Sequence, residues 1–188
     1  MKKLVIIGGG FVGSYCAKVL ENDFDTTLID TNDYFEFTPS VLRVIVEPKN
    51  LKNIHVMHKD YLSKTKIIVG IVKEVNKKYV VVNGKKINFD YLIICSGSRY
   101  EIPIKEQNVL IPTRIETLKK SNENLKRVKN IVLIGGGIAG IELAAEIIEK
   151  FPKKRVTIIE MDSCLIKRNN VKCGVYTENF LKERGVKI

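Results

Sequence analysis

With 188 residues, of which 45% are hydrophobic, the chain can bury one sizeable core or two smaller ones, and no stretch is long and apolar enough to span a bilayer. The first expected strand begins at Lys3, which leaves no room for a secretion or transit signal, so we expect a soluble, cytoplasmic protein. The net charge of +11 comes from scattered basic doublets without interleaved aromatic residues, which argues against nucleic-acid binding and leaves solvated faces, a small anionic ligand or a peripheral contact with an acidic membrane as its role.

The chain opens with a strand–helix–strand pattern. Apolar residues at 3–7 and 26–30 predict strands, and the apolar stretch 10–20 between them predicts a helix. A crossover of this kind joins parallel strands and places the helix on one face of their sheet. We therefore expect an α/β fold with a parallel sheet at the start of the chain.

Short β-branched runs replace this pattern between residues 55 and 94. The runs KIIVGIV, KYVVV, KINF and YLIICSG are typical of strands, and VNGKK predicts a tight hairpin turn because Asn and Gly tolerate positive φ. We expect a small antiparallel meander that returns to a central strand at 91–95. His55 and His58 are expected on the surface or at a strand edge, because no cluster of further metal ligands accompanies them.

The opening pattern returns in the second half of the chain. The expected elements are strands at 131–134 and 155–160 and helices at 138–150 and 175–184. The two copies read LVIIGGGFVGSYCA and IVLIGGGIAGIELAAE, and a charged connector with helical spacing, 107–129, precedes the second. The repeat divides the chain into a first nucleotide-binding unit at 1–106 and a second, incomplete one at 130–188, which implies two nucleotides.

Each copy carries the spacing G-x-G-x-x-G between a strand and a helix. The first glycine allows a sharp turn, the second lets the backbone approach a pyrophosphate, and the third lets helix and strand pack closely. The helix that follows presents free N–H groups and a partial positive charge to the phosphates. The glycines are Gly8, Gly10 and Gly13 in the first copy and Gly135, Gly137 and Gly140 in the second, and the residues that open the helices are Phe11, Val12 and Ile138.

An acidic residue ends the next strand in each copy. Asp30 follows TTLI, and Glu160 follows VTII. A carboxylate at this position accepts hydrogen bonds from ribose hydroxyls, and it repels a 2′-phosphate, so Glu160 favours NADH over NADPH. The coincidence of two glycine motifs with two such carboxylates predicts two dinucleotide sites.

These motifs together resemble the pyridine nucleotide–FAD oxidoreductases, the flavoproteins with two dinucleotide-binding domains. The resemblance covers essentially the whole chain and includes GIVKEV and FDYLIICSGS as well as the two glycine motifs. It implies Rossmann-like units, the first for FAD and the second for NAD(P)H. It also implies flavin contacts at Ser96 and Gly97, an adenine contact at Val72 and an acidic contact at Glu142 in the second unit.

Within this family, DTNDYFEFTPSVLRV is most similar to the type II NADH dehydrogenases and the apoptosis-inducing-factor-like quinone reductases. That similarity implies that Thr38 and Pro39 lie near the flavin ring. Residues 35–46 contain no cysteine, whereas the disulfide reductases of the family carry a redox cysteine pair after the first unit. We therefore expect NADH to reduce the flavin and the electrons to pass to a diffusible acceptor, a quinone or oxygen. No acid or base is required for this transfer, so no catalytic residue is assigned.

Members of the family continue well beyond the length of this chain. We therefore expect a fragment, a truncated gene product or half of a split protein. The alternative function is a non-catalytic dinucleotide-binding module that pairs with a second copy or a complementing chain, because an incomplete sheet exposes an edge that invites pairing.

Overall fold

The computed structural model describes residues 1–98 and 103–188. The contacts among them define two compact units: unit 1 comprises Met1–Thr38 and Leu51–Thr117, and unit 2 comprises Pro39–Asn50 and Leu118–Ile188. The segment Pro39–Asn50 thus groups with the second half of the chain. The division into two cofactor units with a connector between them stays a prediction.

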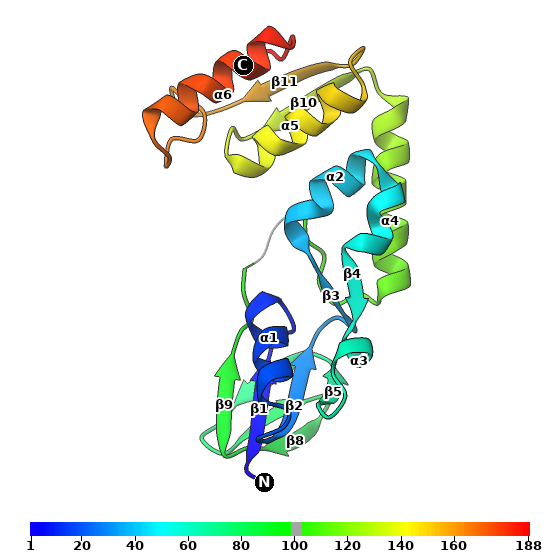
Figure 1. The fold of residues 1–188 in the computed structure, drawn as a ribbon, viewed down its shortest axis with the longest axis vertical. Helices are drawn as coiled ribbons and strands as arrows, with labels where there is room; N and C mark the ends of the chain where they lie inside the picture. Colours follow the sequence, from blue (N-terminus) through cyan, green and yellow to red (C-terminus); the bar gives the residue numbers. More distant parts are fainter. Residues whose placement is uncertain (99–102) are drawn as a thin grey trace. The chain divides into compact units, whose positions relative to one another are not determined.

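A four-stranded parallel sheet forms the centre of unit 1 (Figure 1). Its strands, in spatial order, are β5 (Lys66–Val69), β2 (Asp25–Asp30), β1 (Lys3–Ile7) and β9 (Tyr91–Ile94). Helix α1 (Phe11–Leu20) connects β1 to β2, as predicted, and its Ala17 packs with Leu4, Ile6 and Leu28 of the sheet. The predicted α/β fold with a parallel sheet is confirmed.

An antiparallel meander packs on the opposite face of this sheet. Its strands are β6 (Val72–Val75), β7 (Tyr79–Val82) and β8 (Lys85–Asn88). Val80 and Val82 of β7 pack against Val5 of β1 and Ile29 of β2, and all four side chains are at most 2% exposed. Alternate residues of β1 and β2 therefore face α1 and the meander, so both faces of the sheet are covered.

The hairpin turn of the meander is confirmed, and two other expectations are wrong. Asn83 and Gly84 at the turn have φ of 50° and 73°. The KIIV run, expected in the meander, forms β5 and pairs in parallel with β2. Ile67 packs with the core on one face of the sheet and Ile68 with the core on the other, so this strand is apolar on both faces, as a buried parallel strand requires. The strand expected at the centre, β9, lies at the edge of the described sheet beyond β1.

A layer of short elements completes unit 1. Strands β3 (Tyr34–Glu36) and β4 (His55–Met57) form an antiparallel pair, and α3 (His58–Tyr61) follows β4 directly. The 3-10 helices η1 (Thr38–Ser40) and η2 (Pro48–Asn53) lie between β3 and β4 in sequence, and each contains residues of both units. Helix α4 (Ile111–Arg127), which contains the helical spacing of the connector, begins in unit 1 and ends in unit 2.

A buried arginine joins this layer to the start of α4. Arg114 is fully buried, and its Nε and Nη2 donate to the two carboxylate oxygens of Glu36 at 2.8 and 3.1 Å. Its Nη1 and Nη2 also donate to the carbonyl oxygens of Pro103 and Ile104. The His55 Nε2 lies 2.8 Å from Glu36 Oε2. Burial alone would raise the pKa of Glu36, but the hydrogen bonds from His55 and Arg114 hold it below its usual value, so Glu36 stays charged.

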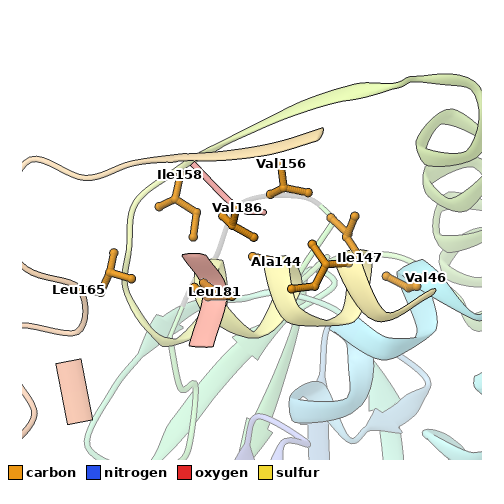
Figure 2. Packing of buried hydrophobic residues seen from close by; sticks show 9 residues of the cluster. Val46, Ala144, Ile147, Val156, Ile158, Leu165, Leu181 and Val186 are labelled. Atoms are coloured by element: carbon orange, nitrogen blue, oxygen red, sulfur yellow. The ribbon is translucent and has the colours of Figure 1, made fainter. Parts of the chain in front are cut away.

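Unit 2 repeats the strand–helix–strand pattern around its own core (Figure 2). Its elements are α2 (Val41–Val46), β10 (Asn130–Ile134), α5 (Ile138–Lys150), β11 (Arg155–Ile159) and α6 (Val171–Glu183). Strands β10 and β11 are parallel. Val156 and Ile158 of β11 point toward Ala144 and Ile147 of α5, with Leu181 of α6 beside them. The predicted α5 has the observed bounds, and the predicted strands differ by one residue at one end.

Two side-chain contacts explain features of unit 2 that the sequence did not predict. Helix α6 begins four residues before the expected start, because the side-chain oxygen of Asn170 caps it by accepting from the Lys172 N–H at 2.9 Å. Helix α2 joins this unit because Asn122 Nδ2 donates to the carbonyl oxygens of Ile45 and Val46 at 2.9 and 2.8 Å, both inside the protein.

The sheet of unit 2 differs from that of unit 1 in one respect. Val132, Ile134 and Ile159 are 58%, 88% and 54% exposed, on the face opposite α5. In the sequence repeat they correspond to Val5, Ile7 and Ile29, and the face that carries those residues packs against the meander. Unit 2 therefore presents an apolar face that no described element covers.

Candidate functional site

The first glycine motif forms the bend between β1 and α1. Gly8 has φ of 99°, and a Cβ on it would lie 2.4 Å from the carbonyl oxygen of Cys95, which follows the neighbouring strand β9. A Cβ on Gly13 would overlap the carbonyl oxygen of Gly8. Both positions therefore need glycine for the chain's own packing.

Gly10 is different, because nothing in the described protein would meet a Cβ there. Its φ of −74° suits any residue, and no atom lies within 4 Å of the position that a methyl group would take. The fold therefore does not require glycine at Gly10, and the open space lies at the first turn of α1. No side chain caps this helix, so its first N–H groups face the space that an anion would occupy.

The second glycine motif repeats this geometry between β10 and α5. Gly135 has φ of 106°, and a Cβ on Gly140 would overlap the Gly135 carbonyl oxygen. Gly137 has φ of −75°, nothing within 4 Å of a Cβ, and no side chain capping the helix that it begins. Both motifs therefore have a first glycine with positive φ, an open second glycine and a third glycine closed by backbone, but only Gly8, and not Gly135, also has atoms within 4 Å of a Cβ.

The two predicted carboxylates lie beside these bends, and backbone N–H groups hold both. Asp30 Oδ1 accepts from the N–H of Thr31 at 2.7 Å. Glu160 Oε1 accepts from the N–H groups of Met161 and Asp162 at 2.7 and 3.0 Å, and its Oε2 accepts from Gly136. The N–H groups of Asp162 and Gly136 lower the pKa of Glu160, which keeps this carboxylate charged at neutral pH.

A cavity of about 430 Å³ lies next to the Asp30 end of β2. Its lining residues are Thr31, Gly70, Ile71, Lys73, Asn83, Gly84 and Asn108. Thr31 follows Asp30, and Ile71 and Lys73 flank Val72, so chain neighbours of the predicted ribose-binding and adenine-binding residues line this hollow, whereas Asp30 and Val72 themselves do not. This volume suits a small ligand group.

The other predicted site residues are placed as follows. Ser96 and Gly97 follow β9, and a Cβ on Gly8 would lie 3.1 Å from the Ser96 Cα, so this pair lies beside the first bend. Phe11, Val12 and Ile138 are half or more exposed at the starts of α1 and α5. Thr38 and Pro39 form part of η1, and Glu142 is exposed on α5. Their roles toward a cofactor stay predictions.

The sequence predicted histidines on the surface or at a strand edge. His55 fits the second alternative, because it lies in β4, whose only described neighbour is β3, but the expectation is wrong for His58. His58 is fully buried, with its Nε2 3.0 Å from Asp30 Oδ2, and the His55 side chain is 3% exposed beside Glu36. The charged partners lie 28 and 19 residues away in sequence, so local spacing contains no signal for either pair. For Arg114 a signal was present, because Arg114, Leu118 and Asn122 follow a four-residue spacing and all three are buried.

The described ranges contain neither a metal-binding cluster nor a membrane-spanning helix. No group of three or more His, Cys, Asp and Glu side chains there is arranged to hold a metal ion. No helix there combines the length and the hydrophobicity required to cross a bilayer.

Comparison with known proteins identifies the family. The profile of the pyridine nucleotide-disulphide oxidoreductases matches residues 2–188. The chain belongs to this family. The predicted family and fold class are thereby confirmed.

The relatives are about twice as long as this chain. Apoptosis-inducing factor homolog A of Dictyostelium discoideum is 33% identical over 197 residues, which cover 100% of this chain and 48% of that protein. Ferroptosis suppressor protein 1 of Xenopus tropicalis is 30% identical over 162 residues, which cover 84% of this chain and 43% of that protein. The solved structure of NDH2 from Plasmodium falciparum in complex with NADH has a TM-score of 0.79 and 19% identity, over 99% of this chain and 47% of that one. The chain spans about half the length of the curated relatives that it matches.

Proposed function

We propose that this chain is the dinucleotide-binding part of an FAD-dependent NADH:acceptor oxidoreductase, with FAD in unit 1 and NADH in unit 2. When bound, FAD supplies the redox chemistry, since it accepts a hydride from NADH and passes electrons to a second substrate. The observation that carries the proposal is the open position at Gly10 and again at Gly137, each at an uncapped helix start with a carboxylate beside it. These residues fit a dinucleotide.

In unit 1 different residues bind different parts of FAD. The N–H groups of Phe11, Val12 and Gly13 at the start of α1 bind the pyrophosphate, which approaches over Gly10. Asp30 accepts hydrogen bonds from the adenosine ribose, and the backbone of Val72 contacts the adenine. The remaining flavin contacts in this proposal are Ser96, Gly97, Thr38 and Pro39.

In unit 2 the arrangement favours NADH. The first turn of α5, from Ile138, binds the pyrophosphate over Gly137, and Glu142 contributes a further polar contact. Glu160 accepts hydrogen bonds from the adenosine ribose. Because its backbone hydrogen bonds hold Glu160 in the charged form, a 2′-phosphate at the same place is repelled, and NADPH binds more weakly than NADH.

The electron acceptor in this proposal is a small diffusible molecule, a quinone or oxygen. Its support is that residues 35–46 contain no cysteine, and the chain's four cysteines are all free, two of them exposed. The stretch that follows the first unit therefore offers no cysteine for a thiol relay. The excess of basic charge suits dinucleotide phosphates and a peripheral contact with an anionic membrane.

The test is a titration of the purified chain with FAD, followed by flavin fluorescence, and then anaerobic addition of NADH. We expect saturable binding of FAD, no binding of riboflavin, which lacks the adenosine part, and loss of the oxidised flavin absorbance after NADH is added. NADPH should bind at least about 10-fold more weakly. A chain that binds neither FAD nor NADH at millimolar concentration would contradict the proposal.

A second candidate function rests on the exposed face of Val132, Ile134 and Ile159. We propose that a second copy of this chain packs on that face, which is apolar like the face of unit 1 that the meander covers. The chain is then a dinucleotide-binding module of a complex. Sedimentation over a range of concentrations should show self-association that Ile134→Lys weakens, because Ile134 is 88% exposed and its replacement leaves the fold unchanged. A monomer at all concentrations that contains NADH-reducible flavin would favour the first function.

A further inference from the structure

The carboxylate of Asp30 has a second partner that the motif does not require. Its Oδ2 lies 3.0 Å from Nε2 of His58, at the start of α3, and His58 is fully buried. The Asp30 side chain is 15% exposed. The Thr31 N–H occupies one lone pair of Oδ1 and His58 one lone pair of Oδ2, so each oxygen retains a lone pair for another donor.

The carboxylate of Asp30 fixes Nε2 of His58 as a donor, because a carboxylate can only accept. The Tyr61 hydroxyl lies 2.7 Å from the other ring nitrogen, Nδ1. Burial, opposed by a hydrogen bond with Ser14, raises the pKa of Tyr61 to about 12, so its proton is present at neutral pH. The result is a hydrogen-bonded Tyr61–His58–Asp30 chain that ends in donation from Nε2 to the carboxylate.

Unit 2 lacks this chain, which provides an internal comparison. A Cβ on Gly9 would lie 2.4 Å from Asp30 Oδ2 and 2.5 Å from the ring of His58. A Cβ on the corresponding Gly136 would lie 2.4 Å from Leu165 Cδ2 and 3.0 Å from Glu160 Oε2. A leucine therefore lies beside the second bend where a histidine lies beside the first. Three backbone N–H groups hold Glu160, whereas one backbone N–H group and His58 hold Asp30.

We propose that His58 is a positioning residue of the first site. By donating from Nε2, it orients Asp30 so that the free lone pairs of the carboxylate face the adenosine ribose. The first site therefore binds a ribose with its hydroxyl groups more tightly than a deoxyribose. The inference rests on the proposed function, in which Asp30 binds the ribose of FAD. In the second site, backbone N–H groups alone hold the corresponding carboxylate of Glu160. In the first site, a side chain outside the glycine motif, that of His58, shares this role.

The experiment compares FAD with an FAD analogue built on 2′-deoxyadenosine, by flavin fluorescence, in the wild-type full-length chain and in variants. His58→Leu reproduces the apolar residue of the second site, and His58→Gln keeps an N–H donor. We expect the wild type to bind FAD about 10-fold more tightly than the deoxy analogue, His58→Leu to lose most of this ratio, and His58→Gln to recover at least half of it on a logarithmic scale. A role in stability alone would weaken both ligands equally and leave the ratio unchanged.

Two controls separate the possible failures. His55→Gln changes a buried histidine of the same unit that contacts Glu36 and not Asp30, and it should keep the wild-type ratio. NADH binding at unit 2 should be the same in every variant. If the wild type does not bind FAD, the proposed function fails. If it binds FAD and folded His58→Leu keeps the wild-type ratio, the positioning role alone is wrong. If His58→Leu does not fold, His58→Phe, which keeps a ring of similar shape without an N–H donor, replaces it, and an unchanged ratio in that variant overturns the inference while a reduced ratio supports it.

Discussion

Gly10→Ala is expected to leave the chain folded and to weaken FAD binding about 100-fold, or about 2.8 kcal/mol. The added methyl group meets no described atom within 4 Å, and the φ of −74° is one that alanine adopts readily. The same methyl group occupies the space through which a pyrophosphate approaches the first turn of α1. Circular dichroism and urea unfolding measure the first effect, and FAD titration measures the second.

Gly13→Ala is the matched control, because it tests the opposite kind of glycine three residues away. Alanine is favoured over glycine inside a helix by about 1 kcal/mol, but here its Cβ would overlap the Gly8 carbonyl oxygen, which belongs to the backbone of the same bend. We expect the clash to dominate and the free energy of unfolding to fall by about 2 kcal/mol or more. Equal stability losses in the two variants, or unchanged FAD affinity in Gly10→Ala, would show that the open position is not a phosphate site.

Arg114→Met is expected to lower the free energy of unfolding by about 3–5 kcal/mol. The substitution removes the bidentate contact to Glu36 and the hydrogen bonds to the carbonyl oxygens of Pro103 and Ile104. The carboxylate of Glu36 would then stay buried with His55 as its only remaining side-chain partner among the described residues. Breaking a buried ion pair costs this much because the remaining charge is not compensated. Urea unfolding of the full chain measures the effect.

A double variant and a surface control sharpen this experiment. Adding Glu36→Gln to Arg114→Met should recover part of the lost stability, since the uncompensated charge is then absent. Lys182→Met removes an exposed i,i+4 pair with Glu178 and should change stability by about 0.5 kcal/mol or less. A loss in Arg114→Met as small as that of Lys182→Met would mean that the buried network does not stabilise unit 1.

The elements that the sequence predicted well depend on neighbours along the chain. The two strand–glycine–helix bends, the Asn83-Gly84 turn and the bounds of α5 all follow from residue period and from backbone conformations that only certain residues adopt. The same is true of the carboxylates that end β2 and β11, because parallel strands place their C-terminal ends at one edge. These local features were sufficient to predict the α/β fold, and the resemblance that they carry was sufficient to predict the family.

Tertiary structure alone decided which distant groups meet. KIIV has the composition of a meander strand and of a buried parallel strand, and only its place beside β2 distinguishes them. His58 reaches Asp30 across 28 residues, and Arg114 reaches Glu36 across 78. The sequence does not show which distant group will pair with a buried polar residue. The free energy of burying that residue depends on which donor or acceptor the fold brings within about 3 Å of it. The two glycine bends could therefore be predicted from the sequence itself. The contact of His58 with Asp30 and the buried network of Arg114 and Glu36 could not.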